Sequence, residues 1–393
     1  MATILLIIIY MVFIGLGLPD SVFGTAWPSI YTELNLPVGN ASIITMIMSV
    51  CTAVASYFST RLINKFGTGI ITTASTLITA LALLGFSFAN SFVWLCVLGV
   101  PLGLGAGAID SALNNYVATH YKSSHMNFLH AFYGVGVAIS PLILSFTLTA
   151  EDGWRKGYVL VFIIQTLIFA FSLIALPLWK KANEKQTETQ TKPITLSFKQ
   201  MAKMPAVRVA WLVFFSACAL EFTCGTWGCT YLVSAENLSE SISAKFLTLF
   251  YVGITSSRII SGLISSKVSA KTLVFSGSSV IAVGLLMQLL PIPPTIKGFS
   301  LLLIGLGIGP IFPNLTYLTP TFFGKDLSQS ITGTIMVACN LGICLMPPAF
   351  GLVAQYLSVS LLPFFLLATY LALILTMITY VKMPKQKSSD LNF

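Results

Sequence analysis

Charged side chains are scarce in this sequence. Lysine, arginine, aspartate and glutamate together make up 8% of the 393 residues, whereas soluble domains typically contain about 25%. Hydrophobic residues make up 56%, and the mean hydropathy is +0.89. A soluble globule of this size cannot bury so much apolar surface, so the composition excludes a soluble protein. We expect an integral membrane protein with little of its chain outside the lipid bilayer.

Motifs for metal binding, disulfide formation and catalysis are also absent. The seven cysteines lie in apolar stretches without CxxC spacing or nearby histidine clusters, which argues against a zinc site and a disulfide framework. The sequence shows no nucleophile–base pair and no Walker loop, so we expect no enzyme, no catalytic residue, no cofactor and no metal site. The glycines of "GLGAGA", 103–108, match a dinucleotide fingerprint only superficially, and close helix packing explains them.

Apolar stretches of roughly 20 residues, long enough to span a bilayer, occur twelve times. A polar and charged stretch, 180–206, follows the sixth, with a short interfacial helix expected near 195–203. This pattern predicts an all-α membrane protein with a six-helix bundle over 1–179, a cytoplasmic linker over 180–206 and a second bundle over 207–393. The expected spans are 4–31, 39–62, 68–90, 92–118, 126–148, 156–179, 207–234, 243–266, 272–291, 297–322, 328–356 and 359–382.

The basic residues predict the orientation. With both termini in the cytoplasm, only four of the 21 lysines and arginines face outward, namely Arg155, Lys156, Lys245 and Lys297. The other 17, Arg258 among them, then fall in cytoplasmic loops or helix ends, as the positive-inside rule requires. The net charge of +9 therefore reflects topology rather than nucleic-acid binding. We expect a monomer, spanning the cell membrane many times.

The two halves repeat each other in sequence. "DSVFGTAW" from Asp20 returns as "EFTCGTW" from Glu221, about 201 positions later, and "GLGAGAI" at 103–109 returns as "GLGIGPI" at 305–311. "GVAISP", which ends at Pro141, is echoed by "GICLMP", which ends at Pro347. Because the related spans keep their order and orientation, these are parallel repeats. Such repeats predict a substrate site between the halves, near the middle of the membrane.

Twelve spans in a six-plus-six repeat with a charged central loop resemble the major facilitator superfamily. The resemblance covers essentially the whole chain and implies the major facilitator fold. The loop after the second span departs from the usual signature of the superfamily, because "TRLINKFG" has Asn64 where an aspartate is expected. This departure points away from the most typical drug-efflux branch.

Three acids are expected inside the membrane, namely Asp20 in span 1, Asp110 in span 4 and Glu221 in span 7. A carboxylate at that depth costs about 2.5–3.5 kcal/mol even on the insertion scale, and we expect no lysine or arginine deep enough to neutralise these three. Binding a proton or another cation lowers this cost, so all three are candidate coupling sites. The alternative for each is a protonated side chain that only hydrogen-bonds between helices.

The stretch "DSALNNY", 110–116, resembles the fourth-span motif of the fucose permease family, which also includes sodium-dependent glucose transporters of animals. In that family an acid in span 1 and an acid in span 4 carry substrate binding and cation coupling. The resemblance implies these roles for Asp20 and Asp110. "SSRIISGLISSKVSAK", 256–271, and "MNFLHAFYGVGVAISP", 126–141, are similar to the eighth and fifth spans of the family.

Polar and aromatic residues near these acids complete the predicted solute site. Asp110 and Asn114 share a helix face, and an amide beside a carboxylate suits a sugar hydroxyl, which both donates and accepts. The alternative for the asparagines is hydrogen bonding between helices, and for Trp27 a place in the interfacial aromatic belt. The expected substrate-binding residues are Asp20, Trp27, Asp110, Asn114, Asn115, Trp227, Asn314 and Asn340.

These residues predict a secondary transporter that works by alternating access. We expect proton-coupled symport of a small sugar-like solute, most simply a monosaccharide. Sodium-coupled sugar symport is chemically close, since carboxylate and amide oxygens also suit sodium. A third interpretation is a proton-antiporting exporter of amphipathic drugs, with Glu221 and the many phenylalanines lining an apolar cavity.

Overall fold

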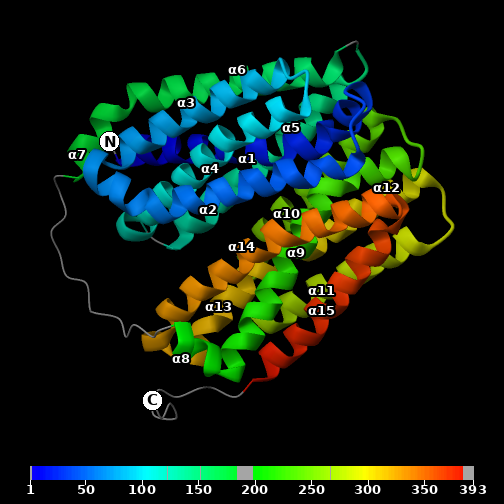
Figure 1. The fold of residues 1–393 in the computed structure, drawn as a ribbon. Coiled ribbons are helices and arrows are strands. Elements are labelled where there is room, and N and C mark those ends of the chain that lie inside the picture. The colour runs from blue at the N-terminus through cyan, green and yellow to red at the C-terminus, as the bar shows by residue number, and fades with distance from the viewer. Residues whose placement is uncertain (1, 122, 151, 184–197, 266, 384–393) are drawn as a thin grey trace.

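The computed structural model describes residues 2–121, 123–150, 152–183, 198–265 and 267–383, and this part of the chain consists of helices and short loops (Figure 1). Among the described residues, twelve helical segments are long and apolar enough to cross a membrane, which confirms the all-α fold and the expected number of spans. The tenth is interrupted between α12 (Pro294–Ile308) and α13 (Ile311–Phe323), because Pro310 has no N–H to continue the helical ladder.

The remaining helices follow the expected spans. The N-terminal half contains α1 (Ala2–Glu33), η1 (Val38–Asn40), α2 (Ala41–Phe66), α3 (Thr68–Ser87), α4 (Phe92–His120), α5 (Ser123–Thr147), α6 (Gly153–Ile174) and α7 (Leu176–Asn183). The C-terminal half contains α8 (Phe198–Lys203), α9 (Pro205–Ser234), α10 (Glu240–Ile264), α11 (Ala270–Leu289), α14 (Lys325–Tyr356), η2 (Val359–Leu361) and α15 (Leu362–Lys382) besides α12 and α13. The short α8 lies within the stretch where the linker was expected to form a helix.

Local sequence signals fix several helix ends. Ser91, Ser239 and Ser269 are N-caps, and each side chain accepts a hydrogen bond from the backbone N–H three residues later. Gly67 ends α2 with φ +83°, and Gly324 ends α13 with φ +75°. Only glycine adopts these angles without strain, so the two turns depend on it.

The repeated glycine motif allows two helix backbones to approach closely in both halves. A Cβ added at Gly103 of α4 would lie 2.2 Å from the carbonyl oxygen of Met48 in α2. In the second half, a Cβ at Gly305 of α12 would lie 2.1 Å from the carbonyl oxygen of Phe250 in α10. These contacts confirm that the glycines allow close helix packing, and they show that the sequence repeat is also a repeat of packing.

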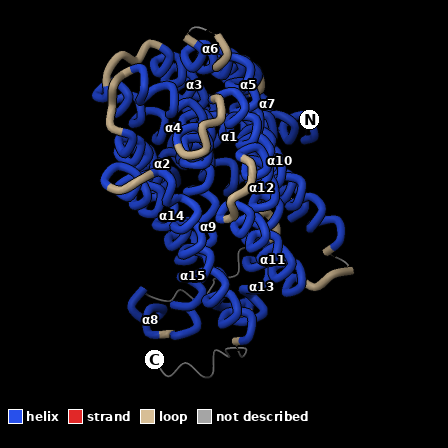
Figure 2. Tube along the Cα trace, turned by 90° about the vertical axis from the view of Figure 1, so that its right-hand side faces the viewer, coloured by secondary structure: helices blue, strands red, loops and turns tan. Residues whose placement is uncertain are grey.

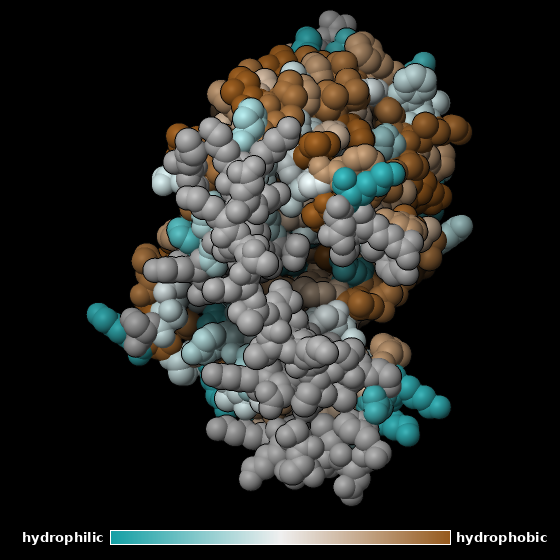
Figure 3. Space-filling view, turned by 90° about the vertical axis from the view of Figure 1, so that its left-hand side faces the viewer, coloured by the Kyte–Doolittle hydropathy of each residue, from teal (hydrophilic) through white to brown (hydrophobic). Residues whose placement is uncertain are grey.

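The two halves form two bundles that meet at one end. The beginning of α1, the end of α15, α7 and α8 lie at one end of the molecule, here called the termini end, and the opposite end is the far end (Figure 1). Across the interface α5 contacts α10, α2 contacts α14 and α1 contacts α9. The bundles diverge toward the termini end (Figure 1), and a view onto that end shows a recess between them (Figure 3).

Hydrogen bonds between the bundles gather at the far end, which faces the viewer in Figure 2. Among the described residues, every such bond lies on the far-end side of Asp20 and Glu221. They join Ser29 to Glu240, Tyr31 Oη to Ser234 Oγ at 3.0 Å, Gly39 N to Gln355 Oε1 at 3.0 Å, Cys229 Sγ to Thr25 O at 3.6 Å, and Ser241 to the carbonyl of Ser145. The far end is therefore closed in this conformation.

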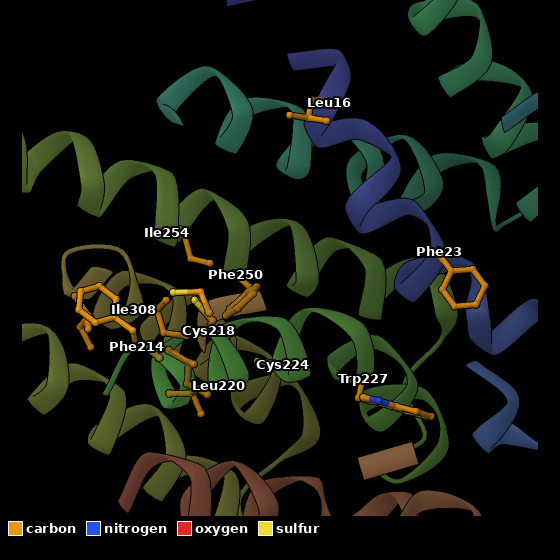
Figure 4. Close-up of a cluster of buried hydrophobic side chains, with 14 of the residues drawn as sticks. Leu16, Phe23, Phe214, Cys218, Leu220, Cys224, Trp227, Phe250, Ile254 and Ile308 are labelled. Atoms are coloured by element: carbon orange, nitrogen blue, oxygen red, sulfur yellow. The ribbon is translucent and has the colours of Figure 1, made fainter. Parts of the chain in front are cut away.

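Apolar side chains fill the interior of each bundle. In the C-terminal bundle, Phe214, Leu220 and Trp227 of α9 pack with neighbours from α10 and α12, while Leu16 and Phe23 extend the cluster into α1 (Figure 4).

Candidate functional site

A cavity lies between the two bundles at the level of Asp20 and Glu221. It contains ≈ 430 Å³ of atom-free space, part of it continuous with solvent. Asp20 lies 13 residues before the end of α1 and Glu221 lies 13 residues before the end of α9, so both are about 20 Å from the far end. The lining residues are Asp20, Tyr133, Gly134, Val137, Glu221, Phe222, Thr226, Tyr251, Ile254, Thr255 and Arg258, contributed by α1, α5, α9 and α10.

Asp20 has a hydrogen bond but no cationic partner. Tyr133 Oη of α5 donates to Asp20 Oδ2 at 2.6 Å, and the Asp20 side chain is exposed because it borders the cavity. Among the described residues, the ion pairs within 4 Å join Arg155 to Glu33, Arg258 to Glu221 and Lys297 to Glu236, and none of them includes Asp20. Asp20 therefore carries an uncompensated charge whenever it is ionised.

Glu221 does have a counter-ion, which corrects a sequence-based expectation. Nη2 of Arg258 lies 3.1 Å from Oε1 and 3.2 Å from Oε2 of Glu221, and each side chain is 17% exposed. Arg258 was expected at a cytoplasmic helix end, and no basic residue was expected at the depth of the acids. It lies within α10, six residues before the helix ends at Ile264, and its long side chain reaches the acid.

Asp110 and Asn114 form the pair expected from their spacing on α4. Asn114 Nδ2 donates to Asp110 Oδ1 at 2.8 Å and to the backbone carbonyl of Asp110 at 3.0 Å. Both side chains are half-buried and lie outside the cavity lining. Asp110 is close enough to Asp20 for their charges to repel each other. The two aspartates thus lie within electrostatic range of each other, and Asp20 is the one that lines the cavity.

The two tryptophans lie away from the cavity. Trp27 Nε1 donates to the carbonyl of Val38 at 2.9 Å, and Trp227 Nε1 donates to the carbonyl of Pro347 at 2.9 Å. Both side chains are fully buried, and Trp227 packs edge to face on Phe350. Each indole ties the far-end part of its helix to a neighbouring segment, so neither offers a stacking face to a solute in this conformation.

The predicted asparagines also differ in position. Asn314 Nδ2 of α13 donates to Ser261 Oγ of α10 at 2.9 Å and to the carbonyl of Pro310 at 2.7 Å, so it bonds between helices. Asn340 of α14 is exposed, and it is not part of the cavity lining. The side chain of Asn115 lies outside the described part of the structure.

Sequence reasoning missed the aromatic hydroxyls of this site. Tyr133 and Tyr251 line the cavity from opposite bundles, and both lie within electrostatic range of Asp20 and Glu221. Tyrosines are common in this sequence, so nothing in the spacing marks these two. The role of Arg258 could have been predicted, because an acid deep in the membrane, such as Glu221, is commonly paired with a cation on a neighbouring span.

Comparison with known proteins places this geometry in a family. Residues 6–347 match the profile of the Major Facilitator Superfamily. The chain is 23% identical over 394 residues to "Bypass of stop codon protein 6" of Saccharomyces cerevisiae, covering 90% of this chain and 77% of the relative. It is 22% identical over 340 residues to the glucose/mannose transporter GlcP of Bacillus subtilis, covering 85% and 84%. The crystal structure of nucleoside transporter NupG has a similar fold, with a TM-score of 0.77, 11% identity and coverage of 98% and 100%.

Proposed function

Because the chain belongs to the major facilitator superfamily, whose members are membrane transporters and not enzymes, we propose that it couples the uptake of a sugar-like solute to the entry of protons. The solute occupies the cavity between the bundles and is released by alternating access. Both termini are cytoplasmic in this proposal, as the distribution of lysine and arginine indicates, so the closed far end faces outward and the structure is inward-facing. The protein acts as a monomer in the cell membrane.

The environment of Asp20 is the observation that supports the proposal most strongly. It is a carboxylate at membrane depth, bonded to Tyr133 at 2.6 Å, bordering the cavity and outside every described ion pair. Taking up a proton removes the cost of an unpaired charge in this place. A proton that binds here when the site faces outward and leaves when it faces inward links the solute to the proton gradient.

Asp110 contributes a second coupling group in this proposal. Its carboxylate interacts electrostatically with Asp20, and Asn114 holds it in place at 2.8 Å. Two carboxylates that repel each other favour a state in which one of them is protonated. Glu221 was an expected coupling residue, but its pairing with Arg258 makes it the weakest of the three, since its charge is already compensated.

The lining of the cavity supports a polar solute. Tyr133, Tyr251, Thr226 and Thr255 supply hydroxyl groups, and Phe222 is the one phenylalanine among the lining residues. Hydroxyl and carboxylate groups recognise sugar hydroxyls, while an exporter of amphipathic drugs calls for an apolar, adaptable cavity. The relation to a glucose/mannose transporter supports the same choice. The motif at 110–116 favours the fucose permease branch.

Uptake into proteoliposomes tests the proposal and separates its alternatives. We expect labelled D-glucose or D-mannose to accumulate when a proton gradient is imposed, and to equilibrate without accumulation when the gradient is absent. Accumulation driven only by a sodium gradient would favour sodium-coupled sugar symport. Failure to transport either sugar, with gradient-driven extrusion of lipophilic cations instead, would contradict the proposal and favour the exporter.

A further inference from the structure

The proposed proton-coupled step uses Asp20 and Asp110 and does not require the Glu221–Arg258 pair, which forms part of the cavity wall. Both residues belong to the C-terminal bundle, on α9 and α10, so their contact persists when the two bundles move relative to each other. Asp20, on α1, faces the pair from the other bundle. The charged groups of the lining are these three residues, which leaves one net negative charge when Asp20 is ionised and none when it is protonated.

Glu221 accepts hydrogen bonds from only part of the Arg258 guanidinium. A single nitrogen, Nη2, contacts both oxygens of Glu221, at 3.1 and 3.2 Å. Its Nε is buried and has no hydrogen-bond partner. A guanidinium has five N–H donors in a rigid plane, so an arginine held along one side still presents donors along the other. The Nε donor is too deeply buried to meet a solute, so the donors that Arg258 can offer at the cavity wall are those of its terminal nitrogens.

We propose that Glu221 makes the site selective for uncharged solutes, with Arg258 as a solute-binding residue and Glu221 as its positioning residue. Glu221 cancels the charge that would attract an anion and fixes the plane of the guanidinium, so Arg258 donates to a hydroxyl or carbonyl oxygen. A carboxylate or sulfonate would instead meet the charges of Glu221 and Asp20, and like charges repel each other. The proposal rests on the cavity being the solute site.

The other groups near Arg258 leave this charge balance unchanged. His130 of α5 approaches Arg258 from the opposite bundle, and an ordinary histidine is mostly neutral at pH 7. Tyr133 and Tyr251 are the remaining titratable groups of the lining, and a tyrosine hydroxyl is uncharged at this pH. Selectivity between neutral and anionic solutes therefore depends on Glu221 and Asp20.

Thiol labelling tests the charge selectivity without knowledge of the substrate. A Thr226→Cys substitution places a thiol in the cavity lining, and its labelling rates with an anionic and a neutral methanethiosulfonate of similar size are compared, after subtracting the labelling of the unsubstituted chain. We expect the ratio of anionic to neutral rate to rise about tenfold when Glu221→Gln is added, since one nearby negative charge is removed. An unchanged ratio would overturn the proposal.

The matched control is a second ion pair of the same bundle. Lys297 Nζ lies 2.7 Å from Glu236 Oε1, with exposures of 15% and 13%, and neither residue lines the cavity. Glu236→Gln should leave the labelling ratio at its original value. If Glu221→Gln fails to fold, Arg258→Gln replaces it in the test. The ratio of anionic to neutral rate should then fall about tenfold, because a positive charge is removed and the anionic reagent reacts more slowly.

Solute binding tests the role of the pair in recognition. D-glucose and D-glucuronate share one ring and differ by a carboxylate, so ligand-dependent thermal stabilisation of the full chain compares them directly. We expect the wild type to prefer D-glucose, and Glu221→Gln to shift that preference toward D-glucuronate by about tenfold to a hundredfold. A wild type that prefers the anion would overturn the inference. If neither sugar binds while labelling follows Glu221, the sugar proposal fails and the charge selectivity stands.

Discussion

Asp110 and Asn114 lie one turn apart on α4, joined by a bond of 2.8 Å from the amide to the carboxylate. Replacing Asp110 by Asn keeps an oxygen that can accept this bond and removes only the titratable charge. We expect Asp110→Asn to fold normally and to abolish gradient-driven accumulation, while exchange of solute across the membrane continues. Size-exclusion profiles and uptake into proteoliposomes measure both properties. Accumulation to the wild-type level would exclude Asp110 as a coupling group.

Asn114 offers a test of hydroxyl recognition. Leucine has a similar size but cannot hold the carboxylate of Asp110 or donate to a solute. If Asn114 serves sugar binding, directly or through Asp110, Asn114→Leu costs about 1–3 kcal/mol, or roughly tenfold to a hundredfold in Kd for a hexose. Thermal stabilisation by a panel of hexoses and of lipophilic cations provides the measurement. Stabilisation by the cations alone, insensitive to the substitution, would favour the exporter.

At the scale of helices, the crossing of α1 over α9 seals the cavity on its far-end side. A Cβ added at Gly24 would lie 2.9 Å from the carbonyl oxygens of both Gly225 and Thr226, so the backbones touch one turn beyond Asp20 and Glu221. Gly24 and Gly225 are equivalent positions of the two repeats. The closed state therefore depends on the absence of a side chain where the repeats meet.

A larger residue at this crossing should hold the far end open. We expect Gly24→Leu to abolish transport while each bundle stays folded, because the added side chain has no room between the two backbones. External thiol labelling of an Asp20→Cys variant should increase when Gly24→Leu is added. Gly262→Leu is the matched control, since nothing lies within 4 Å of a Cβ built at Gly262. Equal labelling with and without Gly24→Leu would show that this crossing is not the seal.

Helix-level features were the most accessible from sequence. The twelve spans follow from hydropathy, and the spacing of the glycines at 103–107 and 305–309 indicates close helix packing. Side-chain direction was not accessible in the same way, because hydropathy leaves the rotation of a buried helix undetermined. For that reason Trp27 was assigned to the solute site although its indole bonds to Val38, while Tyr133 and Arg258 were missed.

At the scale of the whole molecule, transport requires the far end to open and close. A Cβ built at Gly39, before α2, lies 2.7 Å from Cβ of Gln355 in α14, and a disulfide needs about 3.5–4.5 Å. A shift of about 1 Å therefore suffices for the double variant Gly39→Cys/Gln355→Cys to form one. We expect oxidation to stop transport and a reducing agent to restore it, with no effect on either single variant. Undiminished transport by the cross-linked protein would show that the bundles need not separate here.

Proton coupling through Asp20 can be measured as proton movement driven by the solute alone. Proteoliposomes without any imposed gradient receive D-glucose outside, and a trapped pH indicator follows the lumen. We expect the sugar to acidify the lumen in the wild type, and the Asp20→Asn variant to exchange sugar without moving protons. Rapid sugar entry with no change of internal pH in the wild type would contradict proton coupling through Asp20.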